Sequence, residues 1–478
     1  MFRMIVWKEL LDATRSMRFT IGWLVMLVLM VAAVVLLSDD VRQRQERMEL
    51  IERSQDEYVS NYAHLNRINH VLQPVKPPEN SEVFFRGLGD PDEAQSFFSD
   101  PLEKLFPKLD FLYIVSMLLS LLAIIFTYDA ICGEREDGTL KIIHSTPVSR
   151  ATVILGKWVG TWIAVGLPFI AVYFFSVLVG SLIAGISLGP ERWIELGLIC
   201  AASLLYVGFF LCLGLFVSGI VRQPGTSILV LLFLWVLFTM VVPNGSPVVA
   251  AQIKPLPSVN EVERQASALT DWIRDNLVDK ERERIKQIYR GRYAIPAEIT
   301  DYNKEEDFLA AGWSAEQYKG FYDVYVEDVR AALRQVNEEQ NAKAHLLWDE
   351  LDRRVDEQSG LAMGISLLSP TSSYVYFGTE LASVGLRAED YYEQEVSQFG
   401  SAQSAFFEQR WHSEEERQGR KISYEEFIDL SGRPRFAHQP EAVVDRLAGA
   451  LPFAAHFSVM MLVALILAVV AYLRYDVR

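Results

Sequence analysis

Apolar residues are gathered along this chain into long runs that strongly polar segments separate. A helix needs roughly 20 residues to cross a hydrocarbon core about 30 Å thick. No small-x-small cleavage pattern follows the first run, which argues against a signal peptide. The pattern predicts an all-α, polytopic membrane protein with six transmembrane helices and a mainly helical extracytoplasmic domain. The six runs are 20–37, 110–128, 155–186, 193–220, 226–243 and 449–473, so 155–243 holds the third to the fifth.

The basic residues of the short loops all fall on one side of the membrane if each run crosses it once. Short cytoplasmic loops are rich in lysine and arginine. We therefore expect a multi-pass protein of the cell (inner) membrane with both termini, including the tail 474–478, in the cytoplasm. The basic residues concerned are Arg3, Lys8, Arg15, Arg18, Lys141, Arg150, Lys157, Arg222, Arg474 and Arg478.

The polar segments around the first span suggest how this part of the chain is organised. Residues 1–19 place apolar side chains on one stripe with basic ones beside it, as an interfacial (elbow) helix would. A charged cytoplasmic extension is the alternative. The first extracytoplasmic segment, 38–109, holds no proline before Pro74. The first span should therefore continue as a helix outside the membrane until the proline-rich part begins.

The second extracytoplasmic segment, 244–448, is large enough for a domain of its own. Ser314 has capping-box spacing with Gln317, and the proline-free stretch after it predicts one long helix that ends before Gly360. The apolar patch 361–377 is too short to span a membrane. It is either a helix that rests on or re-enters the outer leaflet, or the core of this domain.

Composition argues against several kinds of chemistry. The net charge is −16, and 251–448 holds a surplus of acidic groups, which argues against nucleic-acid binding. The seven histidines show no metal-ligand spacing, and the three cysteines lie in or beside the spans. The segment from Ala151 to Trp158 resembles a phosphate-binding loop but lacks its first glycine and its Ser or Thr. We therefore predict no catalytic, cofactor-binding or metal-binding residue in this chain.

The interiors of the spans are almost free of charged residues. Because buried ionisable groups mark ion and proton pathways, their scarcity argues against a carrier driven by protons or sodium. Gly156 and Gly160 form one small-xxx-small pair, which predicts a surface that packs against another helix or a second subunit.

The short polar loop 129–154 has the features of a docking element. Gly138 permits a tight turn, Pro147 ends the short helix before it, and Ser149 is placed to cap the next helix. Leu140 and Ile143 belong to an apolar face flanked by charged residues, which suits insertion into a groove of a partner protein. An ordinary connector resting on lipid is the alternative.

The motif Glu134-x-x-x-Gly138-Thr139-Leu140, followed by Pro147-Val148-Ser149-Arg150 and Gly156-Lys157, resembles the coupling loop of type-2 ABC exporter permeases. The opening Trp7-Lys8-Glu9-Leu10 with Arg15-Ser16 is similar to their elbow helix. The large extracytoplasmic segments match one branch of that family. By this resemblance the ATPase-coupling residues are Glu134, Gly138, Thr139, Leu140, Ile143, Pro147, Arg150 and Lys157, and the interfacial-helix residues are Trp7, Lys8, Glu9 and Arg15.

The resemblance also implies partners. It predicts a permease subunit without its own ATPase site, which couples ATP hydrolysis by a dimer of separate cytoplasmic ATPase subunits to export. ATP and Mg would bind to that partner and not to this chain. A second permease, identical or paralogous, membrane lipid, and a periplasmic or extracellular protein at 244–448 complete the expected partners. The alternatives are a mechanotransmission complex that moves its extracytoplasmic domain without transport, and a membrane-anchored enzyme.

Overall fold

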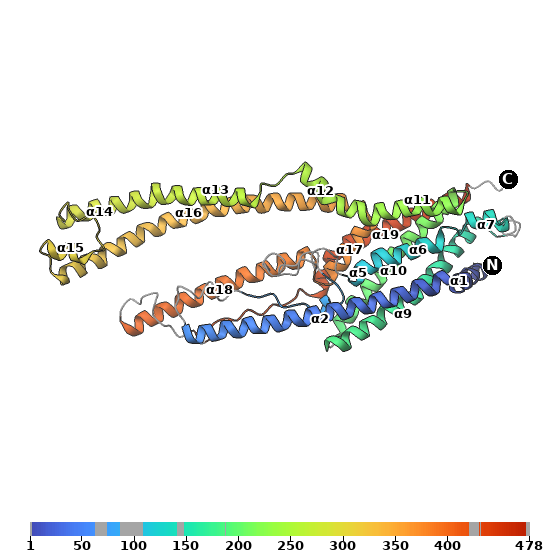
Figure 1. Cartoon of the computed structure of the whole chain (residues 1–478), viewed down its shortest axis with the longest axis horizontal. Helices are drawn as coiled ribbons and strands as arrows, with labels where there is room; N and C mark the ends of the chain where they lie inside the picture. The colour runs from blue at the N-terminus through green and yellow to red at the C-terminus, as the bar shows by residue number, and fades with distance from the viewer. Residues whose placement is uncertain are drawn as a thin grey trace. The chain divides into compact units, whose positions relative to one another are not determined.

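The computed structural model describes residues 2–62, 74–86, 109–140, 148–186, 188–419, 430 and 432–474. It contains two compact units, of which the first comprises Met1–Pro243 with Ser366–Arg478 and the second Asn244–Ile365. Helices make up most of the described residues, and no strand occurs among them (Figure 1). The prediction of an all-α protein is therefore confirmed.

Six helical stretches within the described residues are long and apolar enough to cross a membrane. Each one overlaps a predicted apolar run, which confirms the expected number of transmembrane helices. The stretches are Met17–Glu57, Phe111–Glu136, Arg150–Ala184, Pro190–Ile220, Pro224–Ile253 and Val443–Leu473.

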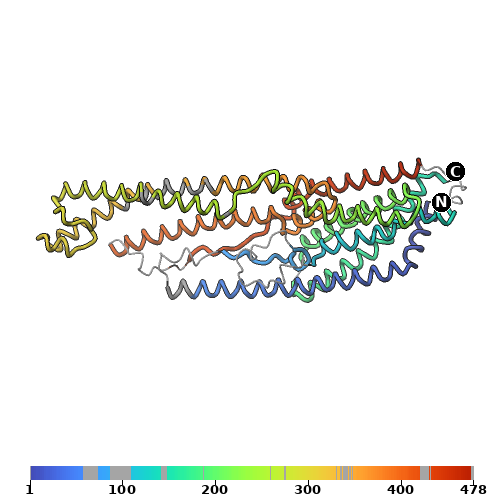
Figure 2. Tube along the Cα trace, turned by 45° about the horizontal axis from the view of Figure 1, so that its top comes forward, coloured from blue at the N-terminus to red at the C-terminus, as the bar shows by residue number. Residues whose placement is uncertain are grey.

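In the first unit, α10 (Pro190–Ile220) occupies the centre of the helical bundle. It packs against α6 (Ser120–Thr127), α9 (Arg150–Ala184) and α19 (Val443–Leu473), and its own middle is almost continuously buried (Figures 1 and 2). A helix that is apolar all round is stable only where protein or lipid surrounds it. The other spans consequently arrange themselves around α10 and leave their outer faces apolar and exposed.

The second and fifth spans are interrupted by short π-helical segments. In the second span, the described order is α5 (Phe111–Ile114), η2 (Val115–Leu119), α6 and then α7 (Cys132–Glu136). In the fifth, it is α11 (Pro224–Val236), η3 (Leu237–Val241) and α12 (Val242–Ile253).

The N-terminal part of the chain forms two helices. Helix α1 runs over Phe2–Thr14, and α2 over Met17–Tyr62. The Ser16 hydroxyl accepts a hydrogen bond from Phe19 N at 3.2 Å, which caps the start of α2. Figure 2 shows α2 as one continuous helix, and its 46 residues exceed the length that a membrane requires. The expected extension of the first span is thus confirmed as far as Tyr62.

The segment 244–448 is divided between the two units. Helix α17 (Pro370–Leu381) belongs to the first unit, where it is buried against α10 and α19. Of the two interpretations of the patch 361–377, this position favours a helix that re-enters the membrane region. The patch is not the core of a separate domain from Ser366 onward.

In the first unit, α18 (Leu386–Gln418) contacts two other segments, 74–86, which contains the short helix η1 (Asn80–Val83), and the extended 432–442. His438 belongs to the second of these segments, and its side chain is 5% exposed. Its Nδ1 is 2.5 Å from Glu395 Oε2, and its Nε2 is 3.3 Å from Glu79 Oε1. The hydrogen bond with Glu79, assisted by Glu395, raises the pKa of His438 above its ordinary value despite burial.

The second unit is built from helices that pack through aromatic side chains. Ser314 and Gln317 form the predicted capping box at the start of α16, with bonds of 3.0 and 3.2 Å. Contrary to the prediction, α16 continues through Gly360, because glycine alone does not end a helix whose neighbouring residues favour it. The helices are α13 (Val259–Ile273), η4 (Arg274–Val278), α14 (Asp279–Tyr293), α15 (Glu305–Ala310) and α16 (Ala315–Ser366). The aromatic core comprises Tyr289, Tyr302, Phe308, Tyr318, Phe321 and Tyr325.

Candidate functional site

Helix α1 lies against α9 at the two glycines that the sequence singled out. A β-carbon at Gly156 would approach Ile5 Cγ2 to 2.9 Å. One at Gly160 would approach Glu9 Cβ to 2.7 Å and Val6 O to 3.0 Å. Only glycine fits at such distances without displacing α1. The small-residue pair of α9 therefore receives a helix of the same chain.

Next to these glycines, four charged side chains form what we call the ionic junction: Lys8, Glu9, Glu134 and Lys157. The Lys157 side chain is only 2% exposed, and its Nζ donates to Glu9 Oε1 at 2.9 Å and Glu134 Oε1 at 2.8 Å. Lys8, which is 52% exposed, donates to the same Glu134 oxygen at 2.8 Å. An ammonium group out of water requires such partners. The ionic junction consequently ties α1, α7 and α9 together.

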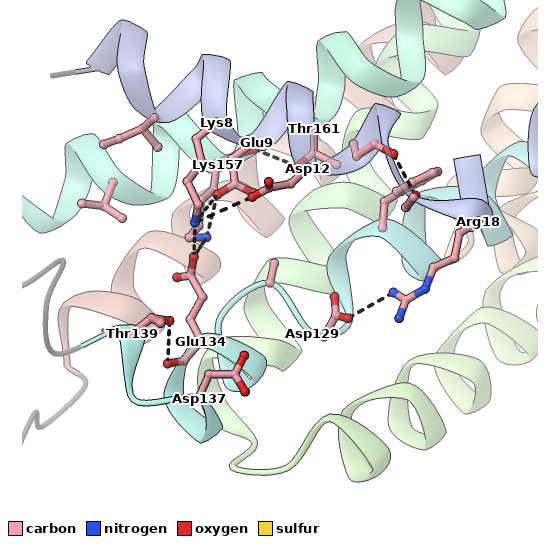
Figure 3. A pocket seen from close by; sticks show the side chains of 16 residues that line it. Lys8, Glu9, Asp12, Arg18, Asp129, Glu134, Asp137, Thr139, Lys157 and Thr161 are labelled. Atoms are coloured by element: carbon pink, nitrogen blue, oxygen red, sulfur yellow. Dashed lines mark hydrogen bonds and ion pairs between the residues drawn. The ribbon is translucent and has the colours of Figure 1, made fainter. Parts of the chain in front are cut away.

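A cavity of about 630 Å³ opens beside the ionic junction (Figure 3). Arg18 and Asp129 form a second ion pair at its edge, with 3.1 Å between Nη1 and Oδ2. The carboxylates outnumber the basic groups in its lining, so the cavity suits a cationic group better than an anion. Its charged lining consists of Lys8, Glu9, Asp12, Arg18, Asp129, Glu134, Asp137 and Lys157.

The start of the loop is fixed to the end of α10. The Ser218 hydroxyl accepts hydrogen bonds from the backbone nitrogens of Ile131 and Cys132 at 3.0 and 3.1 Å. The Arg135 guanidinium donates at 3.2 Å to two carbonyls at the end of α10, groups that a helix end leaves without partners. A displacement of α7 is therefore passed directly to α10.

Residues 136–139 form a continuous exposed stretch of the described loop. Gly138 has φ +74°, a conformation that favours glycine, so the predicted tight turn is present. The Thr139 hydroxyl donates to Glu134 O at 3.2 Å and closes this turn. A partner protein can reach these exposed residues.

Leu140 was expected on an exposed apolar face, and this expectation is wrong. Its side chain is 2% exposed, because the turn folds it back over the ends of α10 and α19. A charge at this position would disturb the bundle as well as any docking surface. Its buried neighbours are Ile131, Val153, Ile154, Leu215, Ala468 and Tyr472.

The remaining predicted residues are distributed around the same end of the bundle. Ser149 caps α9 as expected, and the Arg150 guanidinium donates to Leu473 O at 2.9 Å. Trp7 is 61% exposed, and Arg15 is also exposed. Ile143 and Pro147 lie outside the described residues.

The sequence named all four members of the ionic junction but did not predict that they pair with one another. It also missed a buried ion pair between two spans, Glu195 Oε2 and Arg446 Nη1 at 3.2 Å. For the ionic junction, the available signal was Lys157, which directly follows Gly156 of the small-residue pair. A helix that packs on Gly156 also lies close to Lys157 and can supply a carboxylate to it.

Six apolar helices, with a polar loop and an ionic junction at one end, define a multi-pass helical membrane protein. The chain belongs to the ABC-2 family transporter proteins, whose family model matches residues 3–477. This membership identifies it as the membrane subunit of an ABC transporter.

Two curated relatives carry the description "Probable ABC transporter permease protein NosY". The protein from Stutzerimonas stutzeri is 31% identical over 129 residues, which are 27% of this chain and 46% of that protein. The one from Pseudomonas aeruginosa is 30% identical over 132 residues, again 27% of this chain and 46% of the relative. The chain thus spans about half the length of the curated relatives it matches.

Proposed function

We propose that this chain is the permease of an ATP-driven ABC exporter, coupled to a separate cytoplasmic ATPase at the end of the bundle that carries the ionic junction. Both termini and the loop 129–154 then lie in the cytoplasm, and 38–109 and 244–448 outside the inner membrane. The observation that carries this proposal is the ionic junction, which joins the N-terminal helix, the loop and the third span in one buried cluster.

The chemistry of hydrolysis belongs to the partner in this proposal. ATP and Mg bind to the ATPase subunit, and this chain supplies neither a catalytic nor a cofactor-binding residue. A second permease, identical or paralogous, completes the membrane part, and an extracytoplasmic protein can bind at 244–448. The carboxylate-rich cavity supports a docking partner that offers a basic side chain.

The test is co-purification from native membranes in mild detergent, followed by identification of the partners and an assay of ATP hydrolysis. Glu136→Lys with Asp137→Lys reverses the charge of the exposed loop and should reduce the amount of bound ATPase. Glu46→Lys with Glu49→Lys, on exposed positions of α2, makes the same change of charge elsewhere and should not. Equal losses in both variants, or no ATPase with the wild-type chain, would contradict the proposed docking.

Mechanotransmission is the second candidate, and one connection supports it. Helix α16 of the second unit ends at Ser366, only a short turn before α17, which is buried among the spans of the first unit. Movement among the spans therefore has a covalent route into the second unit. The test uses sealed vesicles that contain the complex. A change in the hydrogen-exchange rate of 259–365 on addition of ATP, without ATP-dependent efflux of vesicle lipids or amphiphiles, would favour this candidate over export.

A further inference from the structure

Helix α17 is bound to three spans by the hydroxyl groups of its first turn and its N-cap. Ser369 Oγ caps the helix, accepting from Thr371 N at 3.0 Å, and donates to the carbonyl of Phe238 in the fifth span. Ser373 Oγ is 2.8 Å from His456 Nδ1 in α19. Phe238 and His456 both lie near the middle of their spans. Where no water is present, each such bond satisfies a polar group that would otherwise have no partner.

Tyr206 of α10 connects α17 to the second span. Its hydroxyl is 2.9 Å from Thr371 Oγ1 and donates to Ser116 O at 3.0 Å. The Tyr206 ring also stacks on that of Tyr374, with 4.6 Å between centroids, and Tyr374 Oη is 2.8 Å from Ser203 Oγ. The neighbours of Tyr206 thus fix both its ring and its hydroxyl.

The two carbonyls that receive these bonds lie in the two π-helical segments. Ser116 is part of η2, and Phe238 is part of η3. A further bond joins the two spans next to these segments, since Trp235 Nε1 of α11 donates to Ser120 Oγ of α6 at 2.8 Å. Short π segments within α-helices occur frequently at functional sites. Here both of them meet at the N-terminus of the same buried helix.

A π segment holds one residue more than the α-helical turn that it replaces. If η2 relaxed to α-helix, the part of the span that follows it would turn by about 100°, the angle of one residue. Each position after η2 would then be taken by the residue one place earlier in the sequence. That part of the span comprises α6, and the chain then continues into α7, which carries Glu134 of the ionic junction.

We propose that the α17 hydroxyls and Tyr206 form a register lock, which holds the second span in its π conformation and whose release turns α6 and the loop that follows. This inference rests on the proposed function for its role in coupling, because the loop end is where the ATPase acts. The lock itself is a property of the permease alone. Tyr206 is its positioning residue for η2, and Ser369 is the corresponding residue for η3.

Cysteine pairs can read the register directly. A β-carbon at Gly22 would be 2.4 Å from Leu122 Cδ2 and 3.5 Å from its Cγ, so Gly22→Cys with Leu122→Cys should form a disulfide. After release of the lock, Leu121 takes the place of Leu122, and Gly22→Cys with Leu121→Cys should react instead. The native cysteines Cys132, Cys200 and Cys212 are all buried and are replaced by alanine in this background.

A second pair, on the other side of η2, is the matched control. A β-carbon at Gly378 would be 2.4 Å from Leu112 Cδ2, and Leu112 precedes η2. Crosslinking of Gly378→Cys with Leu112→Cys should therefore not change when the lock is released. Tyr173→Phe serves as control substitution, since Tyr173 Oη donates to Leu196 O at 3.1 Å and makes no bond to α17.

In the purified permease without ATPase, Tyr206→Phe should raise the ratio of the Leu121 to the Leu122 crosslink about fivefold, the effect of one hydrogen bond. Tyr173→Phe should leave it unchanged. In the complex, ATP with vanadate should shift the same ratio in the wild-type chain. If the crosslink ratio in Tyr206→Phe equals that of the wild-type chain, the register lock is overturned. If ATP with vanadate leaves the ratio of the wild-type complex unchanged, the role of the lock in coupling is overturned. Failure of the ATPase to co-purify overturns the proposed function and leaves the permease result readable. Should Tyr206→Phe not fold, Thr371→Val removes the separate bond that ties the Tyr206 hydroxyl to α17, and it should shift the ratio in the same direction.

Discussion

Lys157 and Lys8 offer a direct measure of what burial does to the ionic junction. Both ammonium groups lie 2.8 Å from the same oxygen of Glu134. Their side chains differ in exposure, with 2% for Lys157 and 52% for Lys8. We expect Lys157→Met to lower the free energy of unfolding far more than Lys8→Met, although both substitutions remove the same charge at the same distance.

The size of the difference follows from the surroundings of Lys157. In Lys157→Met, the carboxylates of Glu9 and Glu134, each 14% exposed, would share a small space without the ammonium group between them. Removing one partner of a buried pair costs about 3–5 kcal/mol. An exposed pair contributes at most about 1 kcal/mol, because water screens it. We therefore expect a loss of about 3–5 kcal/mol for Lys157→Met and below about 1 kcal/mol for Lys8→Met.

Equilibrium unfolding in mixed micelles of dodecyl maltoside with increasing dodecyl sulfate, followed by tryptophan fluorescence, measures both variants. Adding Glu9→Gln to Lys157→Met should recover part of the loss, since it removes one of the two carboxylates that Lys157 no longer neutralises. Equal destabilisation by the two lysine substitutions, or no recovery by Glu9→Gln, would show that burial of the ionic junction does not control its strength.

Three further outcomes follow from particular positions. Gly160→Ala should lower the free energy of unfolding by about 1–3 kcal/mol, because its β-carbon meets α1. Gly197→Ala is the control, since nothing lies within 4 Å of a β-carbon there, and it should not lower this free energy. Thermal unfolding of the two variants distinguishes them. Gly138→Val should cost about 1–2 kcal/mol through its positive φ and reduce co-purified ATPase, and normal assembly would remove the importance of the turn. Because the pKa of His438 is raised on folding, its contribution should be complete below about pH 6.5 and decrease as pH rises through the folded-state pKa. The protection factor for amide exchange in 432–442, which is corrected for the intrinsic pH dependence of exchange, should decrease over that range in the wild-type chain. His438→Gln should abolish this decrease; an unchanged decrease would exclude His438 as its source.

The transmembrane part of the fold follows from the sequence because the bilayer imposes a simple condition. Every backbone group within hydrocarbon must be bonded inside its own helix, so an apolar run of sufficient length is enough to predict a span. The cap at Ser149 and the turn at Gly138 are local and were predicted for the same kind of reason. The end of α16 was not, since whether a helix continues past Gly360 depends on the residues on both sides of it.

The arrangement of the candidate site depends on contacts between distant parts of the chain. Spacing along the loop placed Leu140 on an apolar face, but it does not determine whether lipid, a partner or the chain itself covers that face. The chain itself covers it. The π segments are beyond sequence patterns as well, because their apolar residues are compatible with an ordinary α-helix. The bonds to Ser116 O and Phe238 O come from residues far away in the sequence.

The ionic junction also sets an order for biosynthesis. Glu9 and Lys157 are separated by 148 residues, which at about 5–20 residues per second is roughly 7–30 s of translation. During this interval α1 has been synthesised, but Gly156, Gly160 and Lys157 of α9, which will contact it, have not. Insertion of the third span therefore completes the assembly of the first helix, and a delay at the third span would leave the N-terminus open to membrane proteases.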